Sequence, residues 1–281
     1  MSMPFYVAPE QFMKDKADFA RKNIARGRPL VATVFSGGIL ICAENPSRSL
    51  HKVSEIYDRI AFAGVGRYNE FDQLRRSGVQ HADIKGYQFS REDVDARSLA
   101  NLYAQYMGNV FTHEMKPLEV EILVAEVGTV EAEDQLFHIL YDGSVVDESS
   151  FTVLGGEAEA VITRMKERFA ADWDLGAALR GAALALSGPD RSLGAGDLEV
   201  AVLDRFNGRR AFRRIPVEVA EGLLVAPVVD EPAIEEEAPA GEVPTADDAG
   251  SEAAPESEAA PDSEAAPDSE AAPEEAEPEG G

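Results

Sequence analysis

Residues 30–66, LVATVFSGGILICAENPSRSLHKVSEIYDRIAFAGVG, carry the clearest structural signal in this chain. Leu30–Ser36 and Ile39–Glu44 are apolar runs rich in β-branched residues, and the pair Gly37-Gly38, which tolerates positive φ, joins them. Two such runs around a glycine turn predict a β-hairpin. A polar stretch follows, and a third short apolar run, Ile60–Ala63, closes at Gly64. We therefore expect later helices and strands to pack on a first sheet that begins here.

A helix is expected before this hairpin. Pro9 suits a first helical position, and Gly27 is expected to end the helix as a C-cap. Between them, apolar residues recur at helical spacing. They are Phe12, Met13, Ala17, Phe19, Ala20 and Ile24. Nothing in the sequence of one chain indicates what this stripe packs against, and a neighbouring subunit is our interpretation.

The remaining pattern gives strands in groups rather than strands that alternate with helices. Helices are predicted at 68–79, 93–115, 157–171, 175–186 and 218–225, and strands at 120–127, 136–142, 151–154, 198–203 and 211–215. This order argues against a parallel, doubly wound sheet. Consecutive helix pairs can instead cover two antiparallel sheets that face each other. The predicted fold class is α+β, a four-layer α/β/β/α sandwich with an N-terminal helix.

Charge divides the chain into a body and a tail. Residues 226–281 hold 19 of the 52 acidic residues and no lysine or arginine, which leaves residues 1–225 with 33 acidic and 26 basic residues. The six-residue repeats SEAAPE and SEAAPD run without a break from Ser251 to Glu274. Proline in every repeat and the acidic, aromatic-free composition predict a disordered tail. We therefore divide the chain into residues 1–8, a domain at 9–225 and a tail at 226–281.

Composition also excludes several classes of protein. The body is mildly acidic, which argues against a nucleic-acid partner, and no amphipathic basic helix indicates a membrane surface. No apolar run approaches the roughly 20 residues needed to span a bilayer, and the N-terminus turns charged too early for a signal peptide. Cys42 is the one cysteine, so an intrachain disulfide is impossible. We expect a soluble, cytoplasmic protein.

Catalytic patterns are weak. A layered sandwich of this kind invites comparison with hydrolases whose nucleophile begins the mature chain and uses its own free amine as the base. Thr33 would be the candidate nucleophile here, but it lies inside a strand and would need removal of everything before it. His51, His81, His113 and His138 are scattered, without the spacing of a metal site. We expect no cofactor, no metal and no catalytic residue, with a self-processing hydrolase that uses Thr33 as the alternative.

Lys52, which follows the hairpin, is a candidate ligand-binding residue. It ends the polar stretch and lies close in sequence to the glycines at 64 and 66. An ammonium group beside exposed backbone amides can capture a carboxylate as a point charge. From the residues alone, a solvated surface lysine is the competing interpretation.

Longer motifs carry a resemblance to a known family. Residues 25–80, ARGRPLVATVFSGGILICAENPSRSLHKVSEIYDRIAFAGVGRYNEFDQLRRSGVQ, together with the preceding APEQFMKDKADFARKNIARG, resemble the α-type subunits of the actinobacterial proteasome core particle. LANLYAQ at 99–105, KPLEVEILVAEV at 116–127, YDGS at 141–144 and LEVAVLD at 198–204 extend the similarity. It covers roughly residues 3–225 and omits the repeat tail.

The resemblance implies a non-catalytic subunit of an intracellular protease. In this family the α/β/β/α subunits form homo-heptameric α rings, which cap β subunits whose N-terminal threonines cut peptide bonds. A hexameric AAA ring ATPase docks on the α ring and delivers unfolded, tagged protein substrates. The helix that begins at Pro9 would lie on the outer face of the ring and pack against neighbours.

The resemblance also assigns roles to residues of this sequence. Lys52 would receive the carboxylate at the end of an ATPase tail, with Gly27 and Gly66 as backbone neighbours. The pore would be narrowed by the loop that contains His113, Lys116 and Pro117. The gate over the pore would consist of Ser2, Met3, Pro4, Phe5, Tyr6, Val7 and Ala8.

Overall fold

The computed structural model describes residues 8–225, which build six α-helices, three short 3-10 helices and ten strands. The expected gate residues before Ala8 and the acidic tail lie outside the described residues. The elements in chain order are α1 (Pro9–Ile24), β1 (Leu30–Phe35), β2 (Gly38–Glu44), β3 (Val53–Tyr57), β4 (Ile60–Gly66), α2 (Tyr68–Gln88), α3 (Ala96–His113), β5 (Val120–Glu126), β6 (Gln135–Ile139), β7 (Val145–Glu148), β8 (Phe151–Leu154), α4 (Ala158–Arg168), α5 (Leu175–Ser187), β9 (Leu198–Asp204), β10 (Phe212–Arg214) and α6 (Val217–Leu224).

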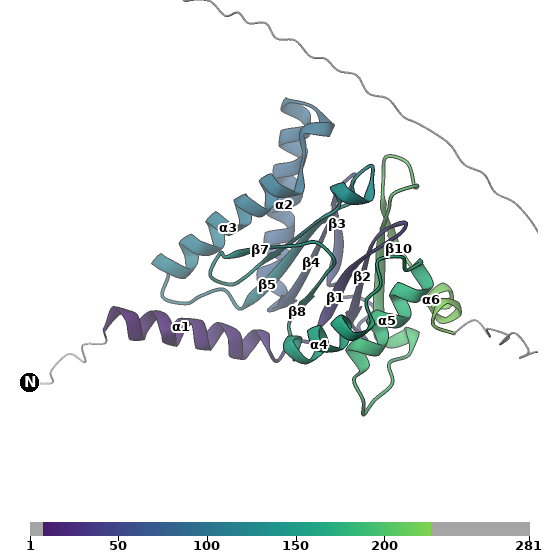
Figure 1. The fold of residues 1–281 in the computed structure, drawn as a ribbon. Coiled ribbons are helices and arrows are strands. Elements are labelled where there is room, and N and C mark those ends of the chain that lie inside the picture. Colours follow the sequence, from purple (N-terminus) through teal and green to yellow (C-terminus); the bar gives the residue numbers. More distant parts are fainter. Residues whose placement is uncertain (1–7, 226–281) are drawn as a thin grey trace, which may run out of the picture. The chain divides into compact units, whose positions relative to one another are not determined.

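The strands form two five-stranded sheets. The first has the order β10-β9-β2-β1-β8, and the second has the order β3-β4-β5-β6-β7. Every strand pair is antiparallel. Helices α2 and α3 pack on the outer face of the second sheet, and α4, α5 and α6 pack on the outer face of the first (Figure 1). The predicted four-layer sandwich is confirmed.

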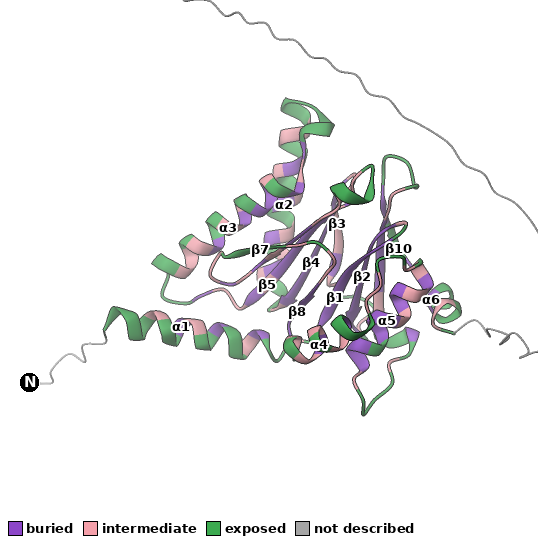
Figure 2. Ribbon diagram, in the orientation of Figure 1, coloured by how far each residue is buried: buried purple, intermediate pink, exposed green. Residues whose placement is uncertain are grey.

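Three buried apolar clusters separate these layers. One lies between the sheets, one between the first sheet and its helices, and one between the second sheet and its helices. Alternate residues of β1 show the division: Leu30, Ala32 and Val34 face the other sheet, while Val31 and Phe35 face the helices. All six residues of β1 and all seven of β2 are buried, as the purple strands in Figure 2 show. Burial on both faces explains why these strands read as continuous apolar runs.

The hairpin at the start of the sequence forms as predicted, with its turn one residue earlier. Phe35 pairs with Gly38, so Ser36 and Gly37 make the two-residue turn. Gly38 opens β2 with φ of 141°, a conformation that disfavours other residues. A Cβ there would lie 2.0 Å from the carbonyl oxygen of Leu203 on β9. Gly38 is therefore fixed both by its backbone angle and by the neighbouring strand.

Two strands were missing from the sequence prediction. Strand β3 reads VSEIY and has two half-buried polar residues, and β7 reads VVDE and is largely exposed. Both are edge strands of the second sheet, so each has one strand neighbour and less apolar surface to bury. The sequence signal of such strands is weak for that reason.

Helix α2 is longer than predicted because its glycines do not break it. A Cβ on Gly78 would lie 1.7 Å from the hydroxyl oxygen of Tyr103, and one on Gly86 would lie 2.1 Å from the hydroxyl oxygen of Tyr57. These glycines let the two tyrosines reach the helix backbone. The prediction that this helix ends at residue 79 was wrong, because both glycines serve close packing and neither ends the helix.

The stripe on α1 is only partly covered within the chain. Ala20 and Ile24 are buried against Tyr141, with Ala17 and Phe111 alongside. Phe12 and Phe19, seven residues apart on one edge of the helix, keep 38% and 47% of their surface exposed. The helix ends at Ile24, and its C-cap is Ala25 rather than Gly27. The exposed edge leaves room for another molecule.

Candidate functional site

Lys52 lies immediately before the edge strand β3. Its carbonyl oxygen accepts a hydrogen bond from the amide of Gly64 on β4, at 3.1 Å. Its ammonium Nζ reaches back to donate to the carbonyl oxygen of Arg28, at 2.6 Å, just before β1 begins. An ammonium has three hydrogens, so this bond leaves donor capacity for a further acceptor.

Gly27 and Gly66 lie beside each other at the same end of the sandwich. A Cβ on Gly27 would lie 3.4 Å from the backbone nitrogen of Gly66 and 2.8 Å from Cγ1 of Val65. Gly66 has φ of 108°, and a Cβ there would lie 2.0 Å from the carbonyl oxygen of Glu119. The fold therefore brings all three residues named by the resemblance into one neighbourhood, with bare backbone next to the lysine.

Burial and neighbouring carboxylates have opposite effects on the pKa of Lys52. Burial lowers the pKa of Lys52 to about 8, the nearby Glu44 carboxylate offsets part of this effect, and Arg28 adds to the lowering. Lys52 is therefore mostly protonated near pH 7 and loses its charge as the pH rises through about 8. Burial favours the neutral amine in the folded state, so between about pH 8 and the ordinary lysine pKa of 10.5 the unfolded chain holds more protons than the folded one. The contribution of Lys52 to the free energy of unfolding therefore rises over that range.

A hollow of about 430 Å³ adjoins Gly27 and Arg28. Its wall includes Glu44 on β2 and Arg191, which donates to both carboxylate oxygens of Glu44 at 3.0 and 2.7 Å. Arg164 on α4 contributes another cation to the wall. The wall also contains Glu157 and Asp190, so its three arginines face three carboxylates and the hollow has no excess of positive charge. It gives a short chain end space beside Gly27.

The predicted pore-loop residues follow the end of α3. His113 is the last residue of α3 and is exposed, with Nδ1 3.1 Å from the carbonyl oxygen of Asn109. The Lys116 ammonium lies 2.7 Å from the carboxylates of Glu70 and Glu119, and Pro117 is buried. Lys116 thus ties the loop to the start of α2. The three residues lie together at the end of α3 and on the segment that follows it, and the Glu119 partner of Lys116 also lies against Gly66.

Lys16 is a residue whose importance the sequence did not indicate. It is 4% exposed, and its Nζ donates to the carbonyl oxygens of Phe111 and Glu114, at 3.0 and 2.6 Å. These are carbonyls at the C-terminal end of α3, where helices leave such groups unpaired and favour a positive charge. Lys16 therefore fastens α1 to the base of the loop at 113–117. Its partners lie 95 and 98 residues away, so no local pattern marks it.

The candidate nucleophiles are not arranged for catalysis. Thr33 is fully buried in β1, and its hydroxyl donates to the carbonyl oxygens of Val34 and Ser150, at 3.3 and 3.4 Å. Burial raises the pKa of the Cys42 thiol to about 12, which keeps it protonated. Within residues 8–225 no cluster of three or more His, Cys, Asp or Glu side chains could hold a metal ion. Across the same residues, none of the helices combines the length and apolar character that crossing a bilayer requires.

In the comparisons with known proteins, both the matching family model and the similar proteins are proteasome subunits. A family model described as "Proteasome subunit" matches residues 24–203. The chain is 66% identical over 224 residues to "Proteasome subunit alpha" of Acidimicrobium ferrooxidans, which covers 79% of this chain and 97% of that protein. It is 55% identical over 250 residues to the protein of the same name from Sanguibacter keddieii, covering 87% and 98% of the two chains. A third, from Thermomonospora curvata, is 55% identical over 226 residues, with 80% and 98% covered.

The bonds of Lys16 generate a prediction about stability. Replacement by methionine, Lys16→Met, keeps the apolar stem but leaves the two carbonyls at the end of α3 without their donor. The free energy of unfolding should fall by about 2 kcal/mol, because bonds from a charged donor are among the stronger ones. Urea unfolding measures the loss, and amide exchange at residues 111–117 should speed up. Lys14→Met, on the exposed side of α1, serves as the control, and equal effects of both variants would refute the role of Lys16.

Proposed function

The chain belongs to the proteasome subunit family, among its α subunits, and on that premise we propose that it forms, gates and docks the outer ring of a proteasome core. The observation that carries the docking role is the meeting of Lys52, Gly27 and Gly66 at one end of the sandwich. A protonated amine beside bare backbone suits the carboxylate at the end of an inserted peptide tail. In this proposal a hexameric AAA ring ATPase supplies the tail.

As an α subunit the chain is a non-catalytic part of a proteasome complex. We propose that peptide-bond cleavage takes place in the β subunits. The buried hydroxyl of Thr33 supports this assignment, since it has neither a free amine nor access for a substrate. The alternative hydrolase would require removal of α1, which packs through Ala20 and Ile24 on the body. Degradation of tagged intracellular proteins would place the complex in the cytoplasm.

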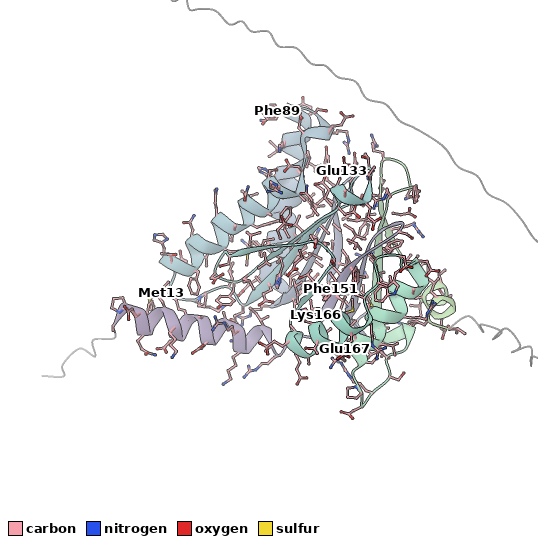
Figure 3. All side chains as sticks on the ribbon, in the orientation of Figure 1. Met13, Phe89, Glu133, Phe151, Lys166 and Glu167 are labelled. Atoms are coloured by element: carbon pink, nitrogen blue, oxygen red, sulfur yellow. The ribbon has the colours of Figure 1, made fainter. Side chains whose placement is uncertain are left out.

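The exposed edge of α1 supports assembly into a homo-heptameric ring. Phe12 and Phe19 lie next to the buried face of α1, so a neighbouring copy can extend that apolar surface without rearranging it. Figure 3 shows Met13 on the same helix, toward its N-terminal end. Ala8 leads into α1, so the seven residues before it would start from the ring face that α1 occupies. This placement supports a gate made by residues 2–8 and a constriction at His113, Lys116 and Pro117.

The far end of α2 supports contact with the β subunits. Tyr87 and Phe89 keep 92% and 73% of their surface exposed, and Figure 3 shows Phe89 at the tip of α2. This tip lies at the β3–β4 turn, where Arg91 pairs with Asp58, whereas Lys52 precedes the opposite end of β3. If ATPase tails enter at the Lys52 end, the apolar tip faces the interior of the particle.

Lys52→Ala should weaken ATPase docking in a core particle assembled with β subunits. Loss of the ammonium removes a charge-assisted bond, so the Kd for the ring ATPase should rise roughly tenfold or more. Cleavage of small peptides without ATPase should be unchanged. Lys166→Ala, an exposed lysine on α4 (Figure 3), is the control, and loss of ring assembly in Lys52→Ala would show that Lys52 is structural instead.

The same site predicts a pH dependence. Only the protonated amine attracts a carboxylate, so docking should weaken as the pH rises from 7 to 9, through the pKa of about 8. Lys52→Arg should dock with little dependence over that range, since guanidinium stays charged. Interferometry of the ATPase on immobilised core particles measures both. A wild-type profile identical to that of Lys52→Ala would contradict the docking role.

Deletion of residues 2–8 tests the gate. Basal cleavage of a fluorogenic peptide by the assembled particle should rise several-fold, because the pore is opened while the active sites stay the same. Titration with a covalent threonine-directed inhibitor should give an unchanged number of sites. Unchanged basal cleavage in a correctly assembled particle would count against the gate.

Substitution at the α2 tip tests the contact with β. The double variant Tyr87→Ser, Phe89→Ser should fold with an unchanged melting temperature, since both side chains are solvated in the single chain. It should nevertheless fail to co-purify with β subunits. Leu184→Ser, an exposed position on α5, should co-purify as the wild type does. Normal co-assembly of the double variant would place the β contact elsewhere.

A further inference from the structure

Glu199, on β9 of the first sheet, holds the segment that precedes β3 of the second sheet. Its carboxylate is 9% exposed and is surrounded by donors from both sides. The groups within bonding distance are Asn45 Nδ2 at 2.8 Å, the Lys52 amide at 2.8 Å, the Val53 amide at 3.3 Å, His51 Nδ1 at 3.2 Å and Arg214 Nη1 at 2.6 Å. A carboxylate with this many partners is satisfied as an acceptor, which argues for a structural rather than a ligand-binding use.

These bonds complete an edge that lacks a strand. Strand β3 ends the second sheet, so the outward amide and carbonyl of Val53 have no neighbouring strand to pair with. Glu199 accepts from the amide, and Arg214 on β10 donates to the carbonyl oxygen of Val53. Side chains of the first sheet thereby substitute for a missing strand. They also join the two sheets directly beside Lys52.

The consequence is that the backbone of Lys52 is held on both sides. Its amide donates to Glu199 at 2.8 Å, and its carbonyl oxygen accepts from the Gly64 amide at 3.1 Å. The side chain therefore starts from a fixed point, from which Nζ reaches the carbonyl oxygen of Arg28. A side chain that binds a ligand in one geometry depends on supporting contacts of this kind, because its displacement by about 1 Å weakens the bond to the ligand.

We propose that Glu199 is a positioning residue for Lys52: it holds the segment at 45–53 so that the Lys52 ammonium stands ready for a tail carboxylate. This inference rests on the docking role proposed above and adds to it a residue 147 positions away in sequence. Asn45 belongs to the same arrangement, since its Nδ2 also donates to the carbonyl oxygen of Leu50, at 2.7 Å.

The charge of Glu199 adds to its positioning role. Burial raises the pKa of its carboxyl, but the bonds from Asn45, the Lys52 amide and Arg214 outweigh this and hold the pKa below its usual range. Glu199 is thus ionised at neutral pH. It also favours the protonated form of Lys52, as Glu44 does. The Lys52 and Val53 amides both donate to Glu199, whereas the Glu44 carboxylate pairs with Arg191. Both carboxylates therefore act on the charge of Lys52, but Glu199 is the one that holds its backbone.

We call the bonds from the Lys52 and Val53 amides to Glu199 the clamp. Two variants of the full chain, assembled with β subunits, separate the effect of the clamp from the effect of negative charge: Glu199→Gln removes both, and Glu44→Gln removes a charge alone. Glu199→Gln should speed amide exchange of Lys52 and Val53 at least tenfold, shift the pH profile of Lys52 acylation by an amine-reactive ester, and raise the Kd of the ring ATPase several-fold. Glu44→Gln should shift the acylation profile but leave the two amides protected. Arg214→Met, a change at a partly exposed residue, should change amide exchange, acylation and Kd in the same direction as Glu199→Gln, but by less. It provides the test if Glu199→Gln fails to assemble.

Each result decides a different claim. If Glu199→Gln and Arg214→Met leave both the amide exchange and the acylation profile unchanged, the positioning role is overturned, whatever Lys52→Ala does to docking. If the amides open in Glu199→Gln and the ATPase Kd does not change, Glu199 does not serve docking. If Lys52→Ala itself binds the ATPase normally, the proposed docking role fails while the clamp on the Lys52 backbone stands.

Discussion

Burial of the two sheets against each other is the constraint on which the structure depends. Their inner faces form one dry cluster, so the outer faces must be covered by helices to remove the remaining apolar surface from water. Helices α2 and α3 cover one sheet and α4, α5 and α6 cover the other. Helix α1 has no place in this scheme. It lies across the end of the sandwich, held by Ala20, Ile24 and the Lys16 ammonium, and is available for contacts between subunits.

The same constraint explains why the candidate site lies at an edge. A charged amine has no place among residues that are buried on both faces, whereas the segment before β3 borders solvent on one side. There the Lys52 ammonium donates to the carbonyl oxygen of Arg28, the residue that follows Gly27. Gly27 and Gly66 approach each other closely because neither has a side chain. The structure then needs Glu199 and Arg214 to complete the edge. The proposed docking site and the bonds that complete the edge of the sheet therefore lie on the same short segment.

Much of the fold could be predicted from the sequence, and the failures have physical causes. The first hairpin was clear because both faces of β1 and β2 are buried, which makes their sequences continuously apolar. Strands β3 and β7 were missed because edge strands bury less and carry polar residues. Helix α2 was predicted to end at residue 79, whereas it continues to Gln88. Its Gly78 makes room for the Tyr103 hydroxyl, a contact between two helices that local sequence does not encode.

The site was less predictable than the fold. Lys52 could be singled out by its neighbours in sequence, but physical reasoning alone did not separate it from an ordinary surface lysine; the resemblance to the α subunits did. Lys16 was not singled out, because its partners at the end of α3 are distant in sequence. Glu199 gave no signal, since its role exists only when β9 meets the segment before β3.

In the proposed assembly this α subunit builds a closed outer ring on a β-subunit core, with Lys52 and the exposed edge of α1 arranged around the pore. Native mass spectrometry of the full chain co-expressed with the β subunit of the same organism would measure the composition of that particle. We expect one particle with equal numbers of the two subunits, the α chains in two rings of seven. A chain that stays monomeric both with and without β subunits would contradict it.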